Sequence, residues 1–240
     1  FSGLRKSLIE GAEESNIELS FCKNADEVDV EKTDGIIAVG RFLSAELEKM
    51  KQLGIQVLFV DSNPDPHEFN SIQPNLQMMV ETAIEYFVQA GYQKIGFIGG
   101  RSWDSTEGRN VLRDTRTRCF ESRARELGLF NQNYVFIGDN FSVDSGYQVG
   151  REIVEKGKDD LPQAFLVASD PLAVGVLQAF NENKLTVPED VSMISINDID
   201  IAKYVSPPLT TFRIDTEELG KVAIETLRNL IVSPKKSKRM

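Results

Sequence analysis

Polar side chains follow directly after several apolar segments of this 240-residue chain. Segment 191–196 is followed by Asn197 and Asp198, and segment 164–168 by Ser169 and Asp170. Ligands of open parallel sheets bind at the carboxyl ends of the strands, where amides, hydroxyls and carboxylates can hydrogen-bond a polar solute. The pattern therefore predicts a receptor for a small polar molecule.

Residues that could support catalysis are few. The one histidine, His67, lies in a proline-rich turn, where a solvated loop residue is the commoner role. Cys22 and Cys119 are too far apart in sequence for a zinc motif and too few for a disulfide framework. No nucleophile elbow or phosphate loop occurs. We therefore expect no enzyme, metal or cofactor.

Composition limits the partners. Lys and Arg total 27 against 37 Asp and Glu, a formal net charge of −10, which repels a phosphate backbone. The basic segment 235–239 is an exception, although short charged ends are usually solvated. No apolar run reaches the length of a membrane span, and two free thiols fit a reducing cytoplasm. We expect a cytoplasmic chain that binds neither DNA nor membranes by itself.

The elements that must position these residues alternate along the chain. Apolar segments typical of strands alternate with segments of helical periodicity, which predicts an α/β fold with parallel sheets. The expected strands are 17–22, 35–39, 56–61, 94–98, 134–138, 164–168, 191–196 and 209–213. The expected helices are 2–15, 44–53, 75–90, 116–128, 142–156, 170–184 and 215–231.

Several strings match a known pattern in the right order. They are Ala90-Gly-Tyr-Gln-Lys-Ile-Gly-Phe-Ile-Gly-Gly100, Ala168-Ser-Asp-Pro-Leu-Ala-Val-Gly175, Val187-Pro-Glu-Asp-Val191, Val191-Ser-Met-Ile-Ser-Ile-Asn-Asp198 and Pro207-Pro-Leu-Thr-Thr211. Each string alone is also common where an ordinary strand meets a turn. Together they resemble the effector-binding core of the lactose/galactose repressor family, in its galactose-repressor-like branch, from end to end.

The resemblance implies a fold and partners. The fold is that of type I periplasmic binding proteins: two similar lobes, each a parallel sheet flanked by helices, joined by crossing strands. The lobes would be residues 1–100 plus 214–240, and 101–213. Relatives dimerise and bind operator DNA through a helix-turn-helix domain, which we expect to be absent here. A strand is also expected before the first helix, and a lobe without that strand would expose a sheet edge.

The resemblance also implies ligand contacts. Arg116 matches a helix-start arginine that binds two ligand oxygens, although a surface arginine is the alternative. Asn197 and Asp198 match a strand-end acidic pair whose first position is more often Asp, and Asp198 could instead cap a turn. Because an amide donates as well as accepts, the ligand of this chain can differ from that of its relatives.

Other candidates each have a structural alternative. Phe141 and Trp103 could stack on a sugar ring or pack between lobes. Phe1 and Arg5 occupy the first-helix position that faces the cleft, Arg5 being an ordinary solvated arginine in the alternative. Ser169, Asp170 and Asn75 are further candidates, and Asp170 and Asn75 also suit helix caps.

We therefore expect the core of a sugar-responsive, allosteric transcriptional repressor that binds galactose or a galactoside between its lobes. The alternative is the solute-binding protein of a sugar transporter, which shares the fold. An enzyme is the third class and would turn over a bound sugar.

Overall fold

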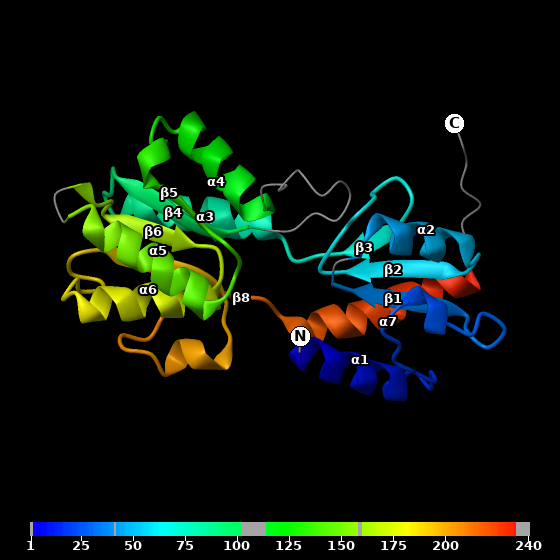
Figure 1. Ribbon diagram of the computed structural model, residues 1–240. Helices are drawn as coiled ribbons and strands as arrows, with labels where there is room; N and C mark the ends of the chain where they lie inside the picture. Colours follow the sequence, from blue (N-terminus) through cyan, green and yellow to red (C-terminus); the bar gives the residue numbers. More distant parts are fainter. Residues whose placement is uncertain (1, 41, 102–113, 158–159, 234–240) are drawn as a thin grey trace. The chain divides into compact units, whose positions relative to one another are not determined.

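The computed structural model describes residues 2–40, 42–101, 114–157 and 160–233 (Figure 1). The chain divides into two compact units, one holding the described residues up to Pro74 and from Asp215 onward, the other holding the described residues between Asn75 and Ile214. Each unit has a parallel sheet with helices on both faces, which confirms the predicted fold class. Among the described helices, none is both long and apolar enough to span a membrane.

The boundary between the units differs from the predicted one. We expected residues 75–100 in the first lobe, but β4 (Ile95–Gly100) pairs with β5 and β6 of the second unit. The buried face of α3 (Leu76–Gln89), including Val80 and Phe87, packs into the same core. Residues 75–100 therefore belong to the second unit.

The first unit is built on a three-stranded sheet in the order β1-β2-β3. Its elements are α1 (Ser2–Glu14), the 3-10 helix η1 (Ala25–Glu27), β1 (Gly35–Val39), α2 (Ser44–Gln52), β2 (Gln56–Val60), β3 (Asn70–Ile72) and α7 (Thr216–Val232). Successive side chains of β2 point to opposite faces of the sheet. Leu58 and Val60 pack with α1 and α7, whereas Val57 and Phe59 pack with α2.

The predicted strand at 17–22 is wrong. These residues do not form a strand. The backbone groups of residues 18–22 make no backbone hydrogen bond with any described residue. The apolar alternation that suggested a strand has another cause, because Ile17 and Leu19 pack against the core formed by α1 and α7. Strand β3 was not predicted, since Asn70–Ile72 is too short to show periodicity.

The second unit has a five-stranded sheet in the order β5-β4-β6-β7-β8, with all neighbours parallel. Its remaining elements are α4 (Thr115–Glu126), the 3-10 helix η2 (Gln132–Tyr134), β5 (Val135–Gly138), α5 (Val143–Glu155), β6 (Ala164–Val167), α6 (Asp170–Glu182), β7 (Ser192–Asn197), η4 (Asp200–Lys203) and β8 (Thr210–Arg213). Helices α3 and α4 lie together on one face, and α5 and α6 on the other (Figure 1).

Glycines let α5 and α6 approach closely. A Cβ on Gly175 of α6 would overlap the carbonyl oxygen of Val143, and one on Gly146 of α5 would overlap the carbonyl oxygen of Leu172. The two helices therefore touch through their backbones. This contact fixes the position of α6, whose first turn borders the candidate site.

Candidate functional site

Predicted site residues gather at the carboxyl edge of the second sheet. Because all five strands are parallel, their carboxyl ends meet at one edge. Phe141 follows β5, Ser169 follows β6, and Asn197 with Asp198 closes β7, while Arg116 lies in the first turn of α4. Three strand ends and one helix start thus supply five predicted residues within one unit.

Arg116 is held in place by its neighbours. Its Nε and Nη2 donate to the two carboxylate oxygens of Asp114 over 2.6 and 3.0 Å, and Nη1 donates to the Ala168 carbonyl over 2.6 Å. The side chain is only 12% exposed, which excludes the surface-arginine alternative. A guanidinium has five N–H groups, and these bonds use three, so two N–H groups have no partner among the described residues.

Phe141 lies beside this arginine. The Cζ atom of Arg116 is 4.6 Å from the centroid of the Phe141 ring, a cation–π contact. The ring is half-buried and also packs against the core of the second unit. Since Arg116 already covers one face of the ring, a ligand would meet the opposite face or the edge.

Asn197 and Asp198 have an unusual backbone. Their φ angles are +127° and +55°, a region that side-chain-bearing residues rarely adopt and that Asn and Asp tolerate best. The Asp198 N–H donates to Thr211 Oγ1 over 3.3 Å, and the Ile214 N–H donates to the Asn197 carbonyl. Both side chains are partly exposed at the edge. Such local strain is common at binding sites.

Asp170, another predicted site residue, is bound by neighbouring groups of the protein. Its side chain is fully buried and accepts hydrogen bonds from Ser195 Oγ, Thr211 Oγ1 and the Ile199 N–H. It does not cap α6, because the N-cap is Ser169. Asp170 instead joins the start of α6 to β7, β8 and the segment that follows Asp198.

The hydroxyl of Ser169 is more available for a ligand hydrogen bond than the carboxylate of Asp170. It is 3% exposed, its hydroxyl makes no cap bond to α6, and this oxygen has no hydrogen-bond partner among the described residues. An unsatisfied buried hydroxyl is costly. Ser169 Oγ therefore offers both a donor and an acceptor beside the helix start.

The remaining predicted residues are Asn75, Arg5, Phe1 and Trp103. Asn75 is exposed and caps α3 by accepting from the Met78 N–H, as the alternative role predicts. Arg5 lies in the first unit, where its Cζ is 4.4 Å from the Phe21 ring centroid. Phe1 and Trp103 fall outside the described residues.

Three supporting residues were missed. Asp114 orients Arg116, and Thr211 and Ser195 hold Asp170. Thr211 belongs to the Pro-Pro-Leu-Thr-Thr string, and Asp114 stands two residues before Arg116 as an N-cap, so both could have been found. Ser195 points inward from mid-strand, and no sequence pattern marks it.

Known proteins resemble this chain in sequence. Residues 84–240 match the family described as periplasmic binding protein-like domain. The HTH-type transcriptional regulator GanR of Bacillus subtilis (strain 168) is 39% identical over 229 residues, which cover 95% of this chain and 69% of GanR. The HTH-type transcriptional regulator LacR of Lactobacillus helveticus is 37% identical over 238 residues, covering 98% and 70%.

Solved structures share the fold. The lac repressor dimer bound to operator and the anti-inducer ONPF has a TM-score of 0.80 at 21% identity, over 96% of this chain and 82% of that one. A LacI family regulator from Lactobacillus casei with bound sucrose has a TM-score of 0.78 at 18% identity, over 97% and 87%. At such identities these likenesses show the periplasmic-binding-protein-like fold alone.

Proposed function

This chain belongs to the LacI/GalR family of transcriptional regulators, and on that premise we propose that it is the effector-binding core of a sugar-responsive repressor. Members of this family are regulators and not enzymes. The solute-binding alternative is not favoured, because the curated relatives are transcription regulators. As a regulator of this family, the parent protein would act in the cytoplasm, where its operator lies.

The placement of Arg116 carries the proposal. Its guanidinium is fixed by Asp114 and Ala168, lies beside an aromatic ring, and has two N–H groups without a partner among the described residues. Paired donors suit neighbouring sugar hydroxyls, and the ring suits the apolar face of a pyranose. Ser169, Asn197 and Asp198 add a hydroxyl, an amide and a carboxylate at the same edge.

We propose galactose or a galactoside as the effector. The galactose-repressor-like form of the Ala168–Gly175 and Val191–Asp198 strings supports this class. The carboxylate of Asp198 would repel a phosphate group, so a neutral saccharide is expected. Binding would shift the equilibrium between two forms of the repressor and thereby change its operator affinity.

Calorimetric titration tests the effector. Galactose, lactose, glucose, sucrose and galactose 6-phosphate would be titrated into the wild-type chain and into Arg116→Ala, Asp198→Ala and Phe141→Ala. We expect saturable binding of a galactose-containing neutral sugar. Each substitution should weaken it by about 1–3 kcal/mol, roughly ten- to hundredfold, because a ligand group loses its partner.

Arg118→Ala is the matched control. Arg118 lies on the same helix and is exposed, and its side chain hydrogen-bonds only Thr115 among the described residues, so loss of that side chain should leave affinity unchanged. Circular dichroism would verify that each variant is folded. A sugar that binds all three site variants as tightly as wild type would contradict the site, and selective binding of the phosphorylated sugar would contradict the effector class.

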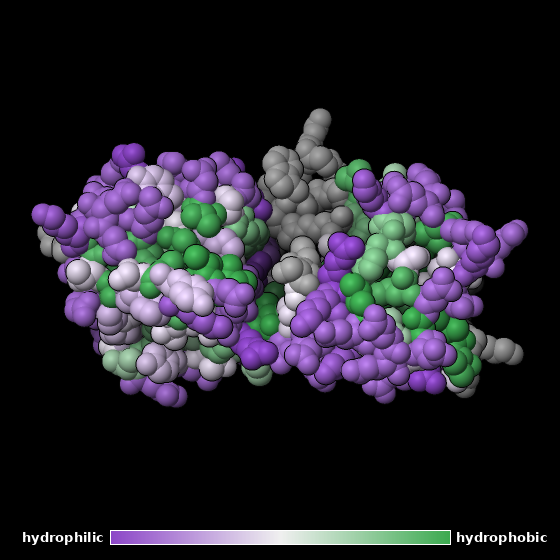
Figure 2. Space-filling view, turned by 90° about the horizontal axis from the view of Figure 1, so that it is seen from below, coloured by the Kyte–Doolittle hydropathy of each residue, from purple (hydrophilic) through white to green (hydrophobic). Residues whose placement is uncertain are grey.

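We also propose that the chain forms a homodimer through the second unit. Large apolar side chains stay exposed near α5, α6 and η4: Val143, Ile199, Ile201 and Tyr204, the last being 80% exposed. Figure 2 shows hydrophobic residues gathered on the face of this unit that carries α6 and η4. Exposed apolar patches mark interaction sites, and most soluble oligomers are symmetric.

Sedimentation equilibrium tests this dimer. We expect Ile201→Asp combined with Tyr204→Ser to shift the chain from dimer to monomer without unfolding it, because both side chains are exposed. Met78→Asp is the control, since Met78 is 52% exposed on α3 and not near this patch. Equal association constants for the double variant and wild type would rule out this surface.

A further inference from the structure

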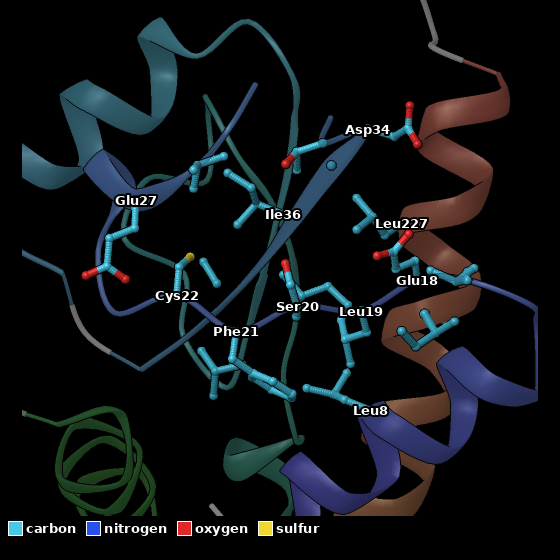
Figure 3. A pocket seen from close by; sticks show the side chains of 18 of the residues that line it. Leu8, Glu18, Leu19, Ser20, Phe21, Cys22, Glu27, Asp34, Ile36 and Leu227 are labelled. Carbon is cyan, nitrogen blue, oxygen red and sulfur yellow. The ribbon is translucent and has the colours of Figure 1, made fainter. Parts of the chain in front are cut away.

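Two arginines of the candidate set lie over aromatic rings in different surroundings. In the first unit, Arg5 borders a cavity of about 990 Å³, and its Cζ lies 4.4 Å from the centroid of the Phe21 ring beside that cavity (Figure 3). Arg5 is exposed, so water can solvate its charge. In the second unit, Arg116 lies over Phe141 in the same way, but its side chain is only 12% exposed. A guanidinium so shielded from water needs a countercharge.

Asp114 supplies this countercharge. Its Oδ1 accepts from Arg116 Nε over 2.6 Å, and its Oδ2 accepts from Arg116 Nη2 over 3.0 Å, so carboxylate and guanidinium form a two-bond pair. The side chain of Asp114 is only 9% exposed, so water screens the pair weakly. The two residues stand two positions apart at the start of α4. The charge of Arg116 is therefore balanced by the protein before any ligand binds.

The same carboxylate also occupies the amino end of α4. Asp114 Oδ1 accepts from the backbone N–H of Arg116 over 3.0 Å, as the side chain of an N-cap residue does. The first N–H groups of a helix carry partial positive charge and attract anions. A helix end and a guanidinium, both of which attract anions, thus bind one carboxylate of the protein itself. A phosphate or carboxylate of a ligand would have to displace Asp114 or lie beside it.

A neutral ligand meets no such conflict. Arg116 Nη1 donates one N–H to the Ala168 carbonyl, and Nη2 donates one to Asp114, so each of these nitrogens has a second N–H without a partner among the described residues. Sugar hydroxyls and anionic oxygens can both accept from these two donors. An anionic group, however, would also be repelled by the Asp114 carboxylate, and this repulsion is strong where water is largely excluded. Charge therefore separates two ligand classes that hydrogen bonding alone would admit.

We propose that Asp114 determines the ligand class of the site: it occupies the place of an anionic ligand group at Arg116 and α4, and so restricts the site to neutral saccharides. This inference rests on the proposed binding of a sugar at Arg116 and deepens it. Asp114 acts through Arg116 and the helix end, and it needs no contact with the sugar. Removing its charge should therefore change which sugars bind, beyond any change in how tightly they bind.

Asp114→Asn tests this role, because it removes the charge and keeps the cap. Asparagine caps helices as well as aspartate does, so α4 should begin as before. Galactose, galacturonate and galactose 6-phosphate would be titrated calorimetrically into wild type and variant at fixed ionic strength. We expect wild type to prefer galactose. In Asp114→Asn, the ratio of affinities should shift toward the two anionic sugars by at least about tenfold.

Asp139→Asn is the matched control. Asp139 follows β5 at the same edge of the sheet and also pairs with an arginine, Arg101, over 3.4 Å, but its side chain is 89% exposed. The control changes the net charge by the same amount. We expect it to change the affinity ratio by less than about twofold, because water and salt screen exposed charges. An unchanged ratio in Asp114→Asn, or an equal shift in Asp139→Asn, would overturn the role of Asp114.

A second measurement does not need the proposed effector. Asp114→Gly removes the carboxylate, and glycine is an acceptable N-cap, so an external anion can take its place. Phosphorus NMR would follow the binding of inorganic phosphate at fixed ionic strength, with circular dichroism verifying that each variant is folded. We expect Asp114→Gly to bind phosphate at least about tenfold more tightly than wild type, and Asp114→Gly with Arg116→Ala to lose most of this gain.

The two measurements separate this inference from the proposed function. If galactose failed to bind wild type while Asp114→Gly gained phosphate binding, the effector would be wrong and the role of Asp114 would stand. If galactose bound wild type as expected but Asp114→Gly gained no phosphate binding, Asp114 would not occupy the place of an anion. A gain that persisted in full without the Arg116 side chain would likewise overturn the inference.

Discussion

At the scale of single residues, Asp170 links stability to the geometry of the site. Its carboxylate accepts three hydrogen bonds, from Ser195, Thr211 and the Ile199 N–H, inside the protein. Two of these donors flank Asn197 and Asp198, whose positive φ angles need support from their surroundings. Asp170 therefore supports the backbone of the residues that we propose meet the effector.

Replacing Asp170 should cost stability. Asp170→Ala leaves three donors without an acceptor in a fully buried place, which we expect to lower the free energy of unfolding by about 3 kcal/mol or more. Asp170→Asn keeps the shape but turns an NH₂ toward a donor, and should cost about 1–3 kcal/mol. Urea denaturation measures both. Asp200→Asn, whose side chain is 99% exposed, is the control and should change nothing.

Much of the candidate site could be predicted from the sequence. Arg116, Phe141, Ser169, Asn197 and Asp198 follow strand ends or start a helix, and such positions are readable from local patterns. The role of Asp170 could not be read, because its partners Ser195 and Thr211 come from two strands far along the chain. The sequence Asp170-Pro171 at the start of a helix predicted a cap. In the structure the Asp170 carboxylate accepts hydrogen bonds from Ser195, Ile199 and Thr211 instead.

At the scale of elements, the α5–α6 contact depends on glycine. We expect Gly175→Ala to lower the free energy of unfolding by about 2 kcal/mol or more, because the added methyl group overlaps the Val143 carbonyl and can be relieved only if the helices separate. Thermal denaturation and urea titration would measure the change in the free energy of unfolding. An unfolding free energy equal to wild type would show that α5 and α6 do not pack this closely.

Gly11→Ala is the matched control for this element. Gly11 also lies inside a helix and is buried, but its nearest contact would be Ile224 Cγ1 at an ordinary 3.4 Å. Alanine favours the helix over glycine by roughly 0.5–1 kcal/mol. This substitution should therefore be neutral or stabilising, in contrast to Gly175→Ala.

Most elements could be predicted from hydrophobic periodicity, because strands and helices alternate and each buries one face or both. The boundary after Pro74 could not be predicted in this way. The sequence of α3 indicates that the helix has an apolar face, but it does not indicate which sheet that face covers. Likewise, Ile17 and Leu19 show the spacing of a strand, but a strand also needs a paired neighbour. Pairing is a property of the folded unit.

At the scale of the whole molecule, the net charge of the chain opposes DNA binding by the chain alone. The formal net charge is −10, so duplex DNA is repelled at long range. The relatives are HTH-type regulators, and we propose that DNA is read by a part of the parent protein other than this core. The basic segment 235–239 lies outside the described residues.

We therefore expect the isolated chain to show no sequence-selective binding to duplex DNA. Fluorescence anisotropy with labelled duplexes, including DNA from the control region of the parent gene, would be recorded at low and physiological salt. Specific protein–DNA affinity depends steeply on salt because phosphate contacts release counterions, so a real complex would weaken strongly as salt rises. A variant with Lys235, Lys236, Lys238 and Arg239 replaced by Gln should behave like wild type. Salt-dependent binding that prefers one sequence and survives in this variant would mean that the folded core itself reads DNA, whereas binding lost in the variant would assign it to the basic segment.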